Sequence, residues 1–404
     1  MLPRKKKIVA ISTSYPLRKE SVSGIFVHKL YAALAESWNV EVLCPDDSSD
    51  GSGGSYQGVN IKPVRYAPKR LQTLGGPGGF MPSIKVAPIK GVLVPGLLAG
   101  LLLNALIKAR TASILHANWA VCGAIAAIAG LIMRIPTVTT LRGDDVFRAK
   151  KSIVDRFFLS IAVHGSGKVI CVSKEMAEQL AVSFPKRRND IEVCLNGVDD
   201  SFFKIQKAEN TSGILRVACV GSLIPRKGYD VLIEAVALLK EMHPINVIIA
   251  GDGPDKSKLI HLAEQHGVLQ YFEFIGEVDQ SRVQNLFVES DVFVLASRSE
   301  GRPNAVIEAV ASGLPVICSD LDGVNGLVTH NLNGWIFSVG DSVALAAALT
   351  EASADIANLK IYGQRGRTLL SVGAGWDVTA RSYSAVFQSL LHAKDSYGDD
   401  GEIL

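Results

Sequence analysis

The sequence contains few cysteines, and none of them is spaced to bind zinc. Its six cysteines are scattered over 404 residues, and no two of them form a CxxC pair. Most stand inside apolar runs, which is typical of reduced structural thiols and not of a disulfide framework. This cysteine pattern predicts a cytoplasmic protein.

Long hydrophobic runs are also missing. The apolar run near the start spans only residues 8–11 before serines and a proline interrupt it, which is too short for a signal peptide. The longest apolar segment, Val92 to Ile107, is interrupted by Pro95, Gly96 and Gly100. It is shorter than the roughly 20 residues that cross a bilayer, so we expect no transmembrane helix.

Acidic residues are absent from one long stretch. Residues 51–143 contain no Asp or Glu but ten Lys or Arg. Residues 1–143 carry 17 basic and 6 acidic side chains, and the rest of the chain carries 25 basic and 33 acidic ones. The positive first part indicates an anionic partner. Aromatic residues are sparse in the acid-free stretch, which argues against nucleic acid.

The chain is long and apolar enough for two domains. It has 404 residues, 48% of them hydrophobic, which is more than one core usually spans. Apolar runs alternate with helical patterns, and strands buried on both faces are typical of parallel sheets. The alternation therefore predicts doubly wound α/β domains. The runs are KIVAIST, SILHAN, TVTTL, KVICVS, LRVACVG, NVIIAGD, DVFVLAS and LPVICSD.

Polar segments mark the expected boundaries. The stretch 196–213 separates two strand–helix series, which predicts a first domain over residues 1–199 and a second over 200–378. The Gly-, Ser- and Pro-rich stretch 46–79 is predicted to be a long loop. Helices are expected over Phe26–Glu36, Ala120–Met133, Asp230–Met242 and Pro303–Ser312.

The most informative segment is SRSEGRPNAVIE, residues 297–308. A buried strand ends, a short loop carries Glu300 and Gly301, and a helix opens at Pro303. Ligands of such sheets bind beyond the carboxyl ends of the strands, and helix N-termini attract phosphate. Glu308 stands in the apolar run AVIEAVA, so a buried carboxylate there needs donors such as ribose hydroxyls. The alternative is a solvent-facing Glu308.

Two loops after other strands carry further candidates. The turn PRKG places Arg226 and Lys227 after the strand LRVACVG, where cations would stabilise a leaving diphosphate. Taken alone, PRKG is also a common surface turn. Gly251 in AGDGP fits a loop near a nucleotide or an ordinary tight turn equally well.

The spacing Glu-x7-Glu, followed by Ala-x-x-x-Gly-x-Pro-Val, resembles the signature of the retaining glycosyltransferases of family 4. That resemblance implies the GT-B architecture, in which two facing Rossmann-like domains enclose a cleft. It also implies that Glu300 contacts the donor sugar, Glu308 the ribose and Lys227 the diphosphate. The donor-binding residues that it implies are Gly24, Arg226, Lys227, Gly251, Glu300, Gly301, Arg302, Pro303, Asn304, Ala305 and Glu308.

The first domain resembles the branch of the family that assembles bacterial surface polysaccharides. There Gly24 would approach the reaction centre, and His116, at the end of the strand SIL, would contact the reacting sugars. The catalytic residues implied are thus His116, Lys227 and Glu300, with no metal and no cofactor. For a lone histidine, a structural role is the alternative.

The chain departs from the family pattern at two positions. Ser222 stands where the family has Arg, and Arg142 stands where it has His. The adjacent pair Asp144 and Asp145 lacks the spacing of metal-dependent transferases. The segment after Trp376 resembles the family's terminal helix, so we expect a helix over 379–395 that returns to the first domain, and a flexible tail over 396–404.

Together these features predict transfer of a hexose from a nucleoside diphosphate sugar to a hydroxyl of a lipid-linked or polysaccharide acceptor, with retention. The alternatives are a sugar-nucleotide epimerase of the same fold and a decayed, non-catalytic sugar-binding protein. The acid-free stretch adds the hypothesis of peripheral binding to an anionic membrane, at the inner face of the plasma membrane. No nucleic acid is expected as a partner.

Overall fold

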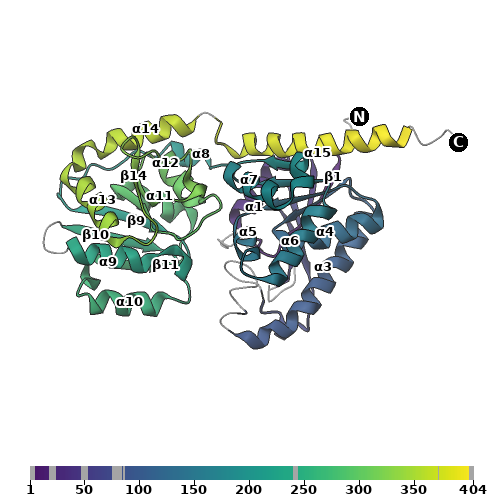
Figure 1. The fold of residues 1–404 in the computed structure, drawn as a ribbon, viewed down its shortest axis with the longest axis horizontal. Coiled ribbons are helices and arrows are strands. Elements are labelled where there is room, and N and C mark those ends of the chain that lie inside the picture. Colours follow the sequence, from purple (N-terminus) through teal and green to yellow (C-terminus); the bar gives the residue numbers. More distant parts are fainter. Residues whose placement is uncertain are drawn as a thin grey trace. The chain divides into compact units, whose positions relative to one another are not determined.

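The computed structural model describes residues 5–17, 24–46, 53–74, 84, 87–239, 244–371 and 373–399. The chain divides into two compact units, residues 1–197 with 376–404 and residues 198–375. The sequence had placed these boundaries after 199 and 378. Each unit is a parallel sheet flanked by helices (Figure 1), so the predicted doubly wound α/β class is confirmed.

The first unit is built on an eight-stranded sheet with the order β3-β4-β2-β1-β5-β6-β7-β8. Neighbouring strands are parallel except β3, which is antiparallel to β4. The strands are β1 Lys7–Ile11, β2 Asn39–Pro45, β3 Gly54–Tyr56, β4 Val59–Val64, β5 Ile114–Asn118, β6 Thr137–Leu141, β7 Lys168–Cys171 and β8 Ile191–Val193. The α-helices are α1 Ile25–Leu34, α3 Val94–Ala109, α4 Ala120–Met133, α5 Asp144–Ala149, α6 Ile153–Gly165, α7 Lys174–Ser183 and α15 Trp376–Asp399.

Strand β1 shows why this sheet is covered on both faces. Ile8 and Ala10 pack into a cluster with residues of α1 and α15, while Val9 and Ile11 pack into a second cluster with residues of α3 and α4. Successive side chains of a strand point to opposite faces. A strand that is apolar at every position therefore requires helices on both sides.

The long loop predicted over residues 46–79 is wrong, because this stretch contains β3 and β4. Val59 and Ile61 are buried while Asn60 and Lys62 are exposed, so β4 has the alternation of a strand with one buried face. The Gly- and Ser-rich flanks hid this six-residue pattern. Residues 47–52 and 75–79 of the stretch lie outside the described residues.

The second unit has a six-stranded, all-parallel sheet with the order β11-β10-β9-β12-β13-β14. Its strands are β9 Leu215–Val220, β10 Ile245–Ala250, β11 Phe272–Gly276, β12 Val292–Leu295, β13 Val316–Ser319 and β14 Gly334–Phe337. Its α-helices are α8 Asp200–Phe203, α9 Tyr229–Leu239, α10 Lys256–Gln265, α11 Gln280–Glu289, α12 Asn304–Ala311, α13 Ser342–Ala354 and α14 Leu359–Ser371.

The two sheets share one topological feature. In each, the first strand of the unit lies between the second and the fourth parallel strands, so the chain direction across the sheet reverses there. The reversal falls between β1 and β5 in the first unit and between β9 and β12 in the second. Ligands of open α/β sheets bind beyond the carboxyl ends of the strands at such a point.

The last helix belongs to the first unit. The helix predicted over 379–395 is α15, which begins at Trp376 and ends at Asp399, and its Tyr383 and Phe387 are buried in the core beside α1. The tail predicted from residue 396 therefore begins inside this helix. Residues 400–404 lie outside the described residues.

Candidate functional site

A charged cluster lies at the carboxyl ends of β9 and β12 in the second unit. Lys227 ends a short 3-10 turn (Pro225–Lys227) that follows β9, and Glu300 lies in the loop that joins β12 to α12. Because β9 and β12 are neighbouring parallel strands, their following loops meet at one edge of the sheet. The sequence positions that the family pattern singled out are thus brought together in space.

Glu300 is the centre of this cluster. One carboxylate oxygen lies 2.7 Å from Lys227 Nζ and accepts a hydrogen bond from the Ser297 hydroxyl at 2.8 Å. The other lies 3.2 Å from a guanidinium nitrogen of Arg226, which also donates to the Ser299 carbonyl. Ser297 was not among the predicted site residues, although it directly follows the strand. Both oxygens of Glu300 therefore have charged partners.

The charges decide the ionisation of Glu300. Burial by itself would raise the pKa of its carboxyl, but the neighbouring Lys227 and Arg226 charges lower that pKa below its ordinary value. Glu300 is therefore a carboxylate at neutral pH. Two cations face this one carboxylate, so the cluster keeps a net positive charge.

A second set of bonds fixes the two loops against each other. Arg298 pairs with both oxygens of Asp230, at 2.9 and 2.6 Å, and donates to the Pro225 carbonyl. Its backbone N–H donates to the carbonyl of Arg226. The cations are consequently held in place by the scaffold and not only by Glu300, which is what a preorganised electrostatic site requires.

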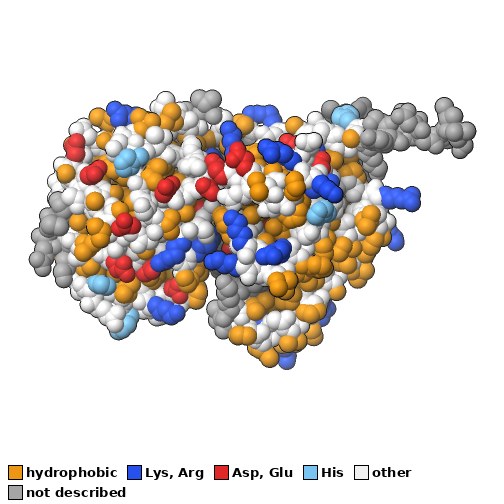
Figure 2. Space-filling view, viewed as in Figure 1, with side chains coloured by type: hydrophobic (Ala, Val, Ile, Leu, Met, Phe, Trp, Pro, Cys, Tyr) orange, Lys and Arg blue, Asp and Glu red, His pale blue; other side chains and the backbone are white. Residues whose placement is uncertain are grey.

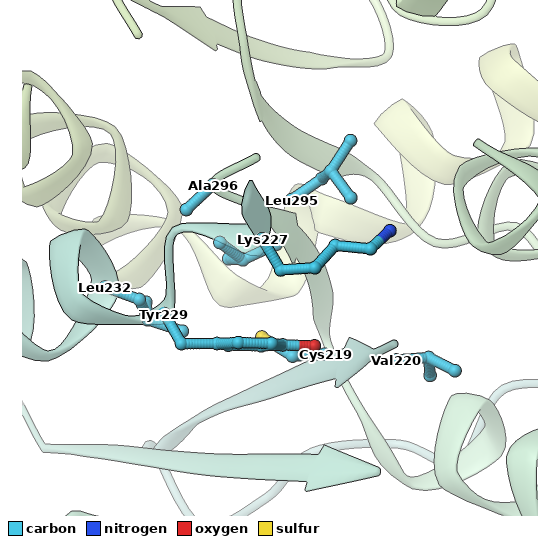
Figure 3. A pocket seen from close by; sticks show the side chains of 8 residues that line it. Cys219, Val220, Lys227, Tyr229, Leu232, Leu295 and Ala296 are labelled. Atoms are coloured by element: carbon cyan, nitrogen blue, oxygen red, sulfur yellow. The ribbon is translucent and has the colours of Figure 1, made fainter. Parts of the chain in front are cut away.

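A small pocket opens beside Lys227 (Figure 3). It is lined by Cys219 and Val220 at the end of β9, by Leu295 and Ala296 at the end of β12, and by the side chains that follow them. The Lys227 and Tyr229 side chains extend side by side into it. The Tyr229 hydroxyl donates to the carbonyl of Gly221, which keeps the ring fixed. The pocket thus has an apolar floor and a cationic rim.

The other residues predicted for donor binding lie on the loop before α12 and on its first turns. Gly301 and Pro303 are buried, whereas Arg302, Asn304, Ala305 and Glu308 are half-buried. Pro303 provides no side-chain cap for α12. Glu308 is neither buried nor fully exposed, so the ribose contact and the solvent-facing alternative both stay open. The contacts of these residues with a donor remain a prediction.

At position 251, directly after β10, the backbone conformation and its close packing require glycine. Its φ is +151°, and a Cβ atom there would lie 2.0 Å from the carbonyl oxygen of Gly221. A side chain would therefore separate the ends of β9 and β10. This packing explains the residue without a ligand, and its role in donor binding stays a prediction.

The corresponding edge of the first unit begins with Gly24, which precedes α1. Its φ is +71°, and a Cβ atom there would lie 2.5 Å from the Ser14 carbonyl oxygen. Glycine is thus required for α1 to start this close to the end of β1. Gly24 lies at the predicted edge of the sheet but is buried. The preceding residue, Ser23, lies outside the described residues.

His116 does not have the position that the sequence predicted. Strand β5 continues past it to Asn118, so His116 is the middle residue of the strand and is fully buried. Its Nδ1 is hydrogen-bonded to the Tyr31 hydroxyl and its Nε2 to the Thr140 hydroxyl, both at 2.8 Å. Both ring nitrogens have partners inside the unit, which favours the structural alternative; the contact of His116 with the reacting sugars stays a prediction.

Burial also keeps the His116 imidazole neutral. It lowers the pKa of His116 to about 3, and the nearby Arg142 charge acts in the same direction. Asn118 donates to the Tyr31 hydroxyl at 2.7 Å, and Thr140 donates to the Tyr383 hydroxyl. These bonds form one connected polar network inside the core.

Arg142 joins this network through Asn118, at the carboxyl end of β5. Its guanidinium donates to the amide oxygens of Asn118, at 2.7 Å, and Asn196, at 2.8 Å, and it lies over the ring of Phe26. Among the described residues it has no carboxylate partner. Sequence reasoning noted Arg142 as a departure but could not foresee Asn118 and Asn196, which are distant in the chain.

The acidic pair beside Arg142 has a structural explanation. Asp145 accepts hydrogen bonds from the backbone N–H groups of Arg142, Gly143, Val146 and Ala120 and so fixes the starts of α4 and α5. Asp144 pairs instead with Arg148. In the part of the chain that the structure describes, no group of three or more His, Cys, Asp or Glu could hold a metal ion. All six cysteines are buried, and none of them forms a disulfide.

Two family models match successive parts of the chain. The model "Glycosyltransferase Family 4" matches residues 23–202, and the model "Glycosyl transferases group 1" matches residues 200–368. Together they span both units, and the second contains the whole Lys227–Glu300 cluster.

Individual proteins resemble the chain over different lengths. Glycogen synthase of Mycobacterium tuberculosis is 26% identical over 400 residues, which cover 94% of this chain and 94% of that protein. The amylovoran biosynthesis glycosyltransferase AmsK of Erwinia amylovora is 31% identical over 40% of this chain and 42% of its own. The structure of HepE from Anabaena in complex with UDP-glucose has a TM-score of 0.71 at 18% identity and covers 96% of this chain and 99% of HepE. That likeness extends the shared fold to both units.

Proposed function

Because the chain belongs to glycosyltransferase family 4, the retaining glycosyltransferases of the GT-B fold, we propose that it transfers a hexose from a nucleoside diphosphate sugar to a hydroxyl of a lipid-linked or polysaccharide acceptor. The family predicted from the Glu300 and Glu308 spacing is thereby confirmed, as is its use of a nucleotide sugar. The acceptor and the identity of the donor are the proposed parts.

The observation that carries the proposal is the pairing of Glu300 with Lys227 and Arg226 at the ends of β9 and β12. During transfer, the bond from the anomeric carbon to the diphosphate oxygen breaks and a bond to the acceptor oxygen forms. Negative charge therefore grows on the diphosphate, and preorganised cations stabilise it. Lys227 and Arg226 are partly exposed, at 15% and 31% of their side chains, so a diphosphate has access to them.

We take a uridine diphosphate hexose as the first donor to test, because HepE was solved with UDP-glucose. A polysaccharide acceptor is supported by the names of two relatives, a glycogen synthase and an amylovoran biosynthesis enzyme. The excess of basic over acidic side chains in residues 1–143 adds that the acceptor, or the surface that bears it, is anionic.

A thermal-shift screen of nucleoside diphosphates and their sugars tests the donor site. One nucleotide should stabilise the wild type, by about 2.7 kcal/mol at a hundred times its Kd. Lys227→Ala and Glu308→Ala should lose that shift. Lys258→Ala, which removes a lysine of the same unit whose side chain is 83% exposed, should keep it. No shift with any nucleotide at millimolar concentration would contradict the proposal.

A further inference from the structure

Three neighbouring helices of the first unit share an apolar outer face. α3 packs against α4, and α4 packs against α6. Large apolar side chains on their outer sides are mostly exposed, with Leu131 at 83% and Ile153 at 82%. Figure 2 shows hydrophobic side chains gathered over α3 and α4 in this unit. We define the apolar face by Val92, Leu103, Ile107, Leu131, Ile153 and Phe157.

The segment Pro88–Ala109 shows that this face is not an ordinary helix surface. The segment consists of a 3-10 turn, Pro88–Leu93, followed directly by α3. It is 22 residues long with a mean hydropathy of 2.0, yet only 22% of its most apolar window is buried. The outer faces of helices in soluble proteins are normally polar. Here Leu103 and Ile107 stand on the outer side, at 59% and 51% exposure. The sequence had predicted a shorter segment, and the observed one is long enough to span a bilayer.

The packing of α3 nevertheless places it on the unit. Leu97, Leu101, Ala105 and Ala109 form an inner row that is fully buried against the sheet. In this fold the helix is therefore a surface element with one side in the core. Its apolar outer side faces away from that core.

Most of the charges around the face are positive. The segment Pro88–Ala109 and α4 lie within the acid-free stretch 51–143. On α6 the acidic residue is Asp155, whose side chain is 18% exposed and lies 3.5 Å from Arg148. Exposed cations stand at the ends of these helices or beside the apolar positions, namely Arg110, Arg134, Lys150, Lys151 and Arg156.

We propose that this face docks on an anionic lipid bilayer. Its apolar side chains would enter the boundary between headgroups and acyl chains, and its cations would meet the anionic headgroups. A patch of this kind on a soluble surface marks an interaction site. A second copy of the chain fits less well, because a twofold interface would bring these cations together, and the acidic residue of α6, Asp155, is already beside Arg148. The surface described here is separate from the Lys227–Glu300 cluster.

Co-sedimentation of the full chain with vesicles tests this surface without donor or acceptor. At low salt the wild type should sediment with vesicles of phosphatidylcholine and phosphatidylglycerol, and high salt should weaken binding. It should bind much less to phosphatidylcholine alone. The double variant Leu103→Glu with Ile107→Glu should lower the ratio of bound to free protein at least about tenfold.

The matched control is Val343→Glu with Leu369→Glu, because these apolar residues are 67% and 60% exposed on the second unit. This control should bind vesicles like the wild type. Both double variants should keep the thermal shift with nucleotide, so a failed vesicle experiment is distinguishable from a failed donor site.

Three results would overturn the proposal. The first is equal binding to neutral and anionic vesicles, or to neither. The second is unchanged binding of the Leu103→Glu, Ile107→Glu variant. The third is a wild-type dimer in sedimentation equilibrium that this variant converts to monomer, which would assign the face to a second copy of the chain.

Discussion

Both units reverse their strand order beside the first strand, but the residues at the two reversal points differ in charge and burial. In the second unit, the loops beyond β9 and β12 carry Lys227, Arg226 and Glu300, with net positive charge and partial exposure. In the first unit, β5 ends at Asn118 and has His116 as its middle residue, and both side chains are fully buried. Among the described residues, the second unit therefore offers a charged cluster to a ligand, whereas His116 and Asn118 are hydrogen-bonded inside the first unit.

This difference shows that fold topology locates an edge but does not decide what the edge does. A crevice at the reversal of strand order is available in both sheets. In the second unit the cations are held by bonds between the two loops, as between Arg298 and Asp230. We therefore expect the diphosphate to bind at the second unit and the network around His116 to have a positioning role in the first.

The largest expected effect comes from removing the negative charge in the second unit. Glu300→Gln keeps the volume of the side chain but removes the charge that holds the Lys227 ammonium and the Arg226 guanidinium in position for the diphosphate. We expect kcat to fall by roughly 10²–10³, the range for loss of a preorganised electrostatic group. Steady-state transfer assays measure it, with the exposed Glu289→Gln as control. A kcat of Glu300→Gln within about twofold of the wild-type value would contradict a functional role for the charged cluster of the second unit.

A smaller effect is expected on the free energy of unfolding, and it comes from His116 in the buried network of the first unit. The pKa of His116 is lowered to about 3 by burial and by Arg142, so the unfolded chain binds a proton that the folded chain excludes. The contribution of the neutral His116 imidazole to the free energy of unfolding is fully present above about pH 6.5. It is lost as the pH falls from there toward 3, at about 1.4 kcal/mol per pH unit.

His116→Gln should remove this pH dependence. Urea unfolding at pH 7, 6 and 5, followed by tryptophan fluorescence, should show the gap between wild type and variant shrinking as the pH falls. A gap that is constant over this range would mean that His116 titrates normally in the folded protein.

The smallest expected effect is on nucleotide affinity and comes from adding a positive charge to the second unit at Ser222. Ser222 is exposed and stands where the family has arginine. Ser222→Arg should strengthen binding of the nucleoside diphosphate by about two- to fivefold, the scale of one exposed ion pair. Isothermal titration measures it, and Ser222→Gln, which is longer but uncharged, should leave the affinity unchanged. An equal gain in both variants would assign the effect to size.

The sequence allowed the sheet edge of the second unit to be predicted because its residues lie in two short segments. Lys227 and Glu300 each follow a recognisable buried strand, so parallel-sheet geometry brings them together. Their direct ion pair could not be predicted, because it depends on the path of two loops. Ser297 was missed for the same reason.

The first unit was predicted less well because its polar partners are remote in the chain. His116 was expected at the end of a strand, but polar Asn118 continues β5 by two residues. Tyr31, Thr140 and Tyr383, which satisfy or surround the imidazole, come from α1, β6 and α15. No local pattern shows that three separate elements bury one histidine. The hairpin of β3 and β4 was missed because its pattern is short.

The most direct test of the contrast is a crystal structure of the chain with a bound uridine diphosphate hexose. The account predicts the diphosphate at the ends of β9 and β12, within hydrogen-bond distance of Lys227 Nζ, with the ribose at Glu308. A diphosphate bound instead by the first unit, beside Arg142 and beyond the ends of β1 and β5, would contradict it.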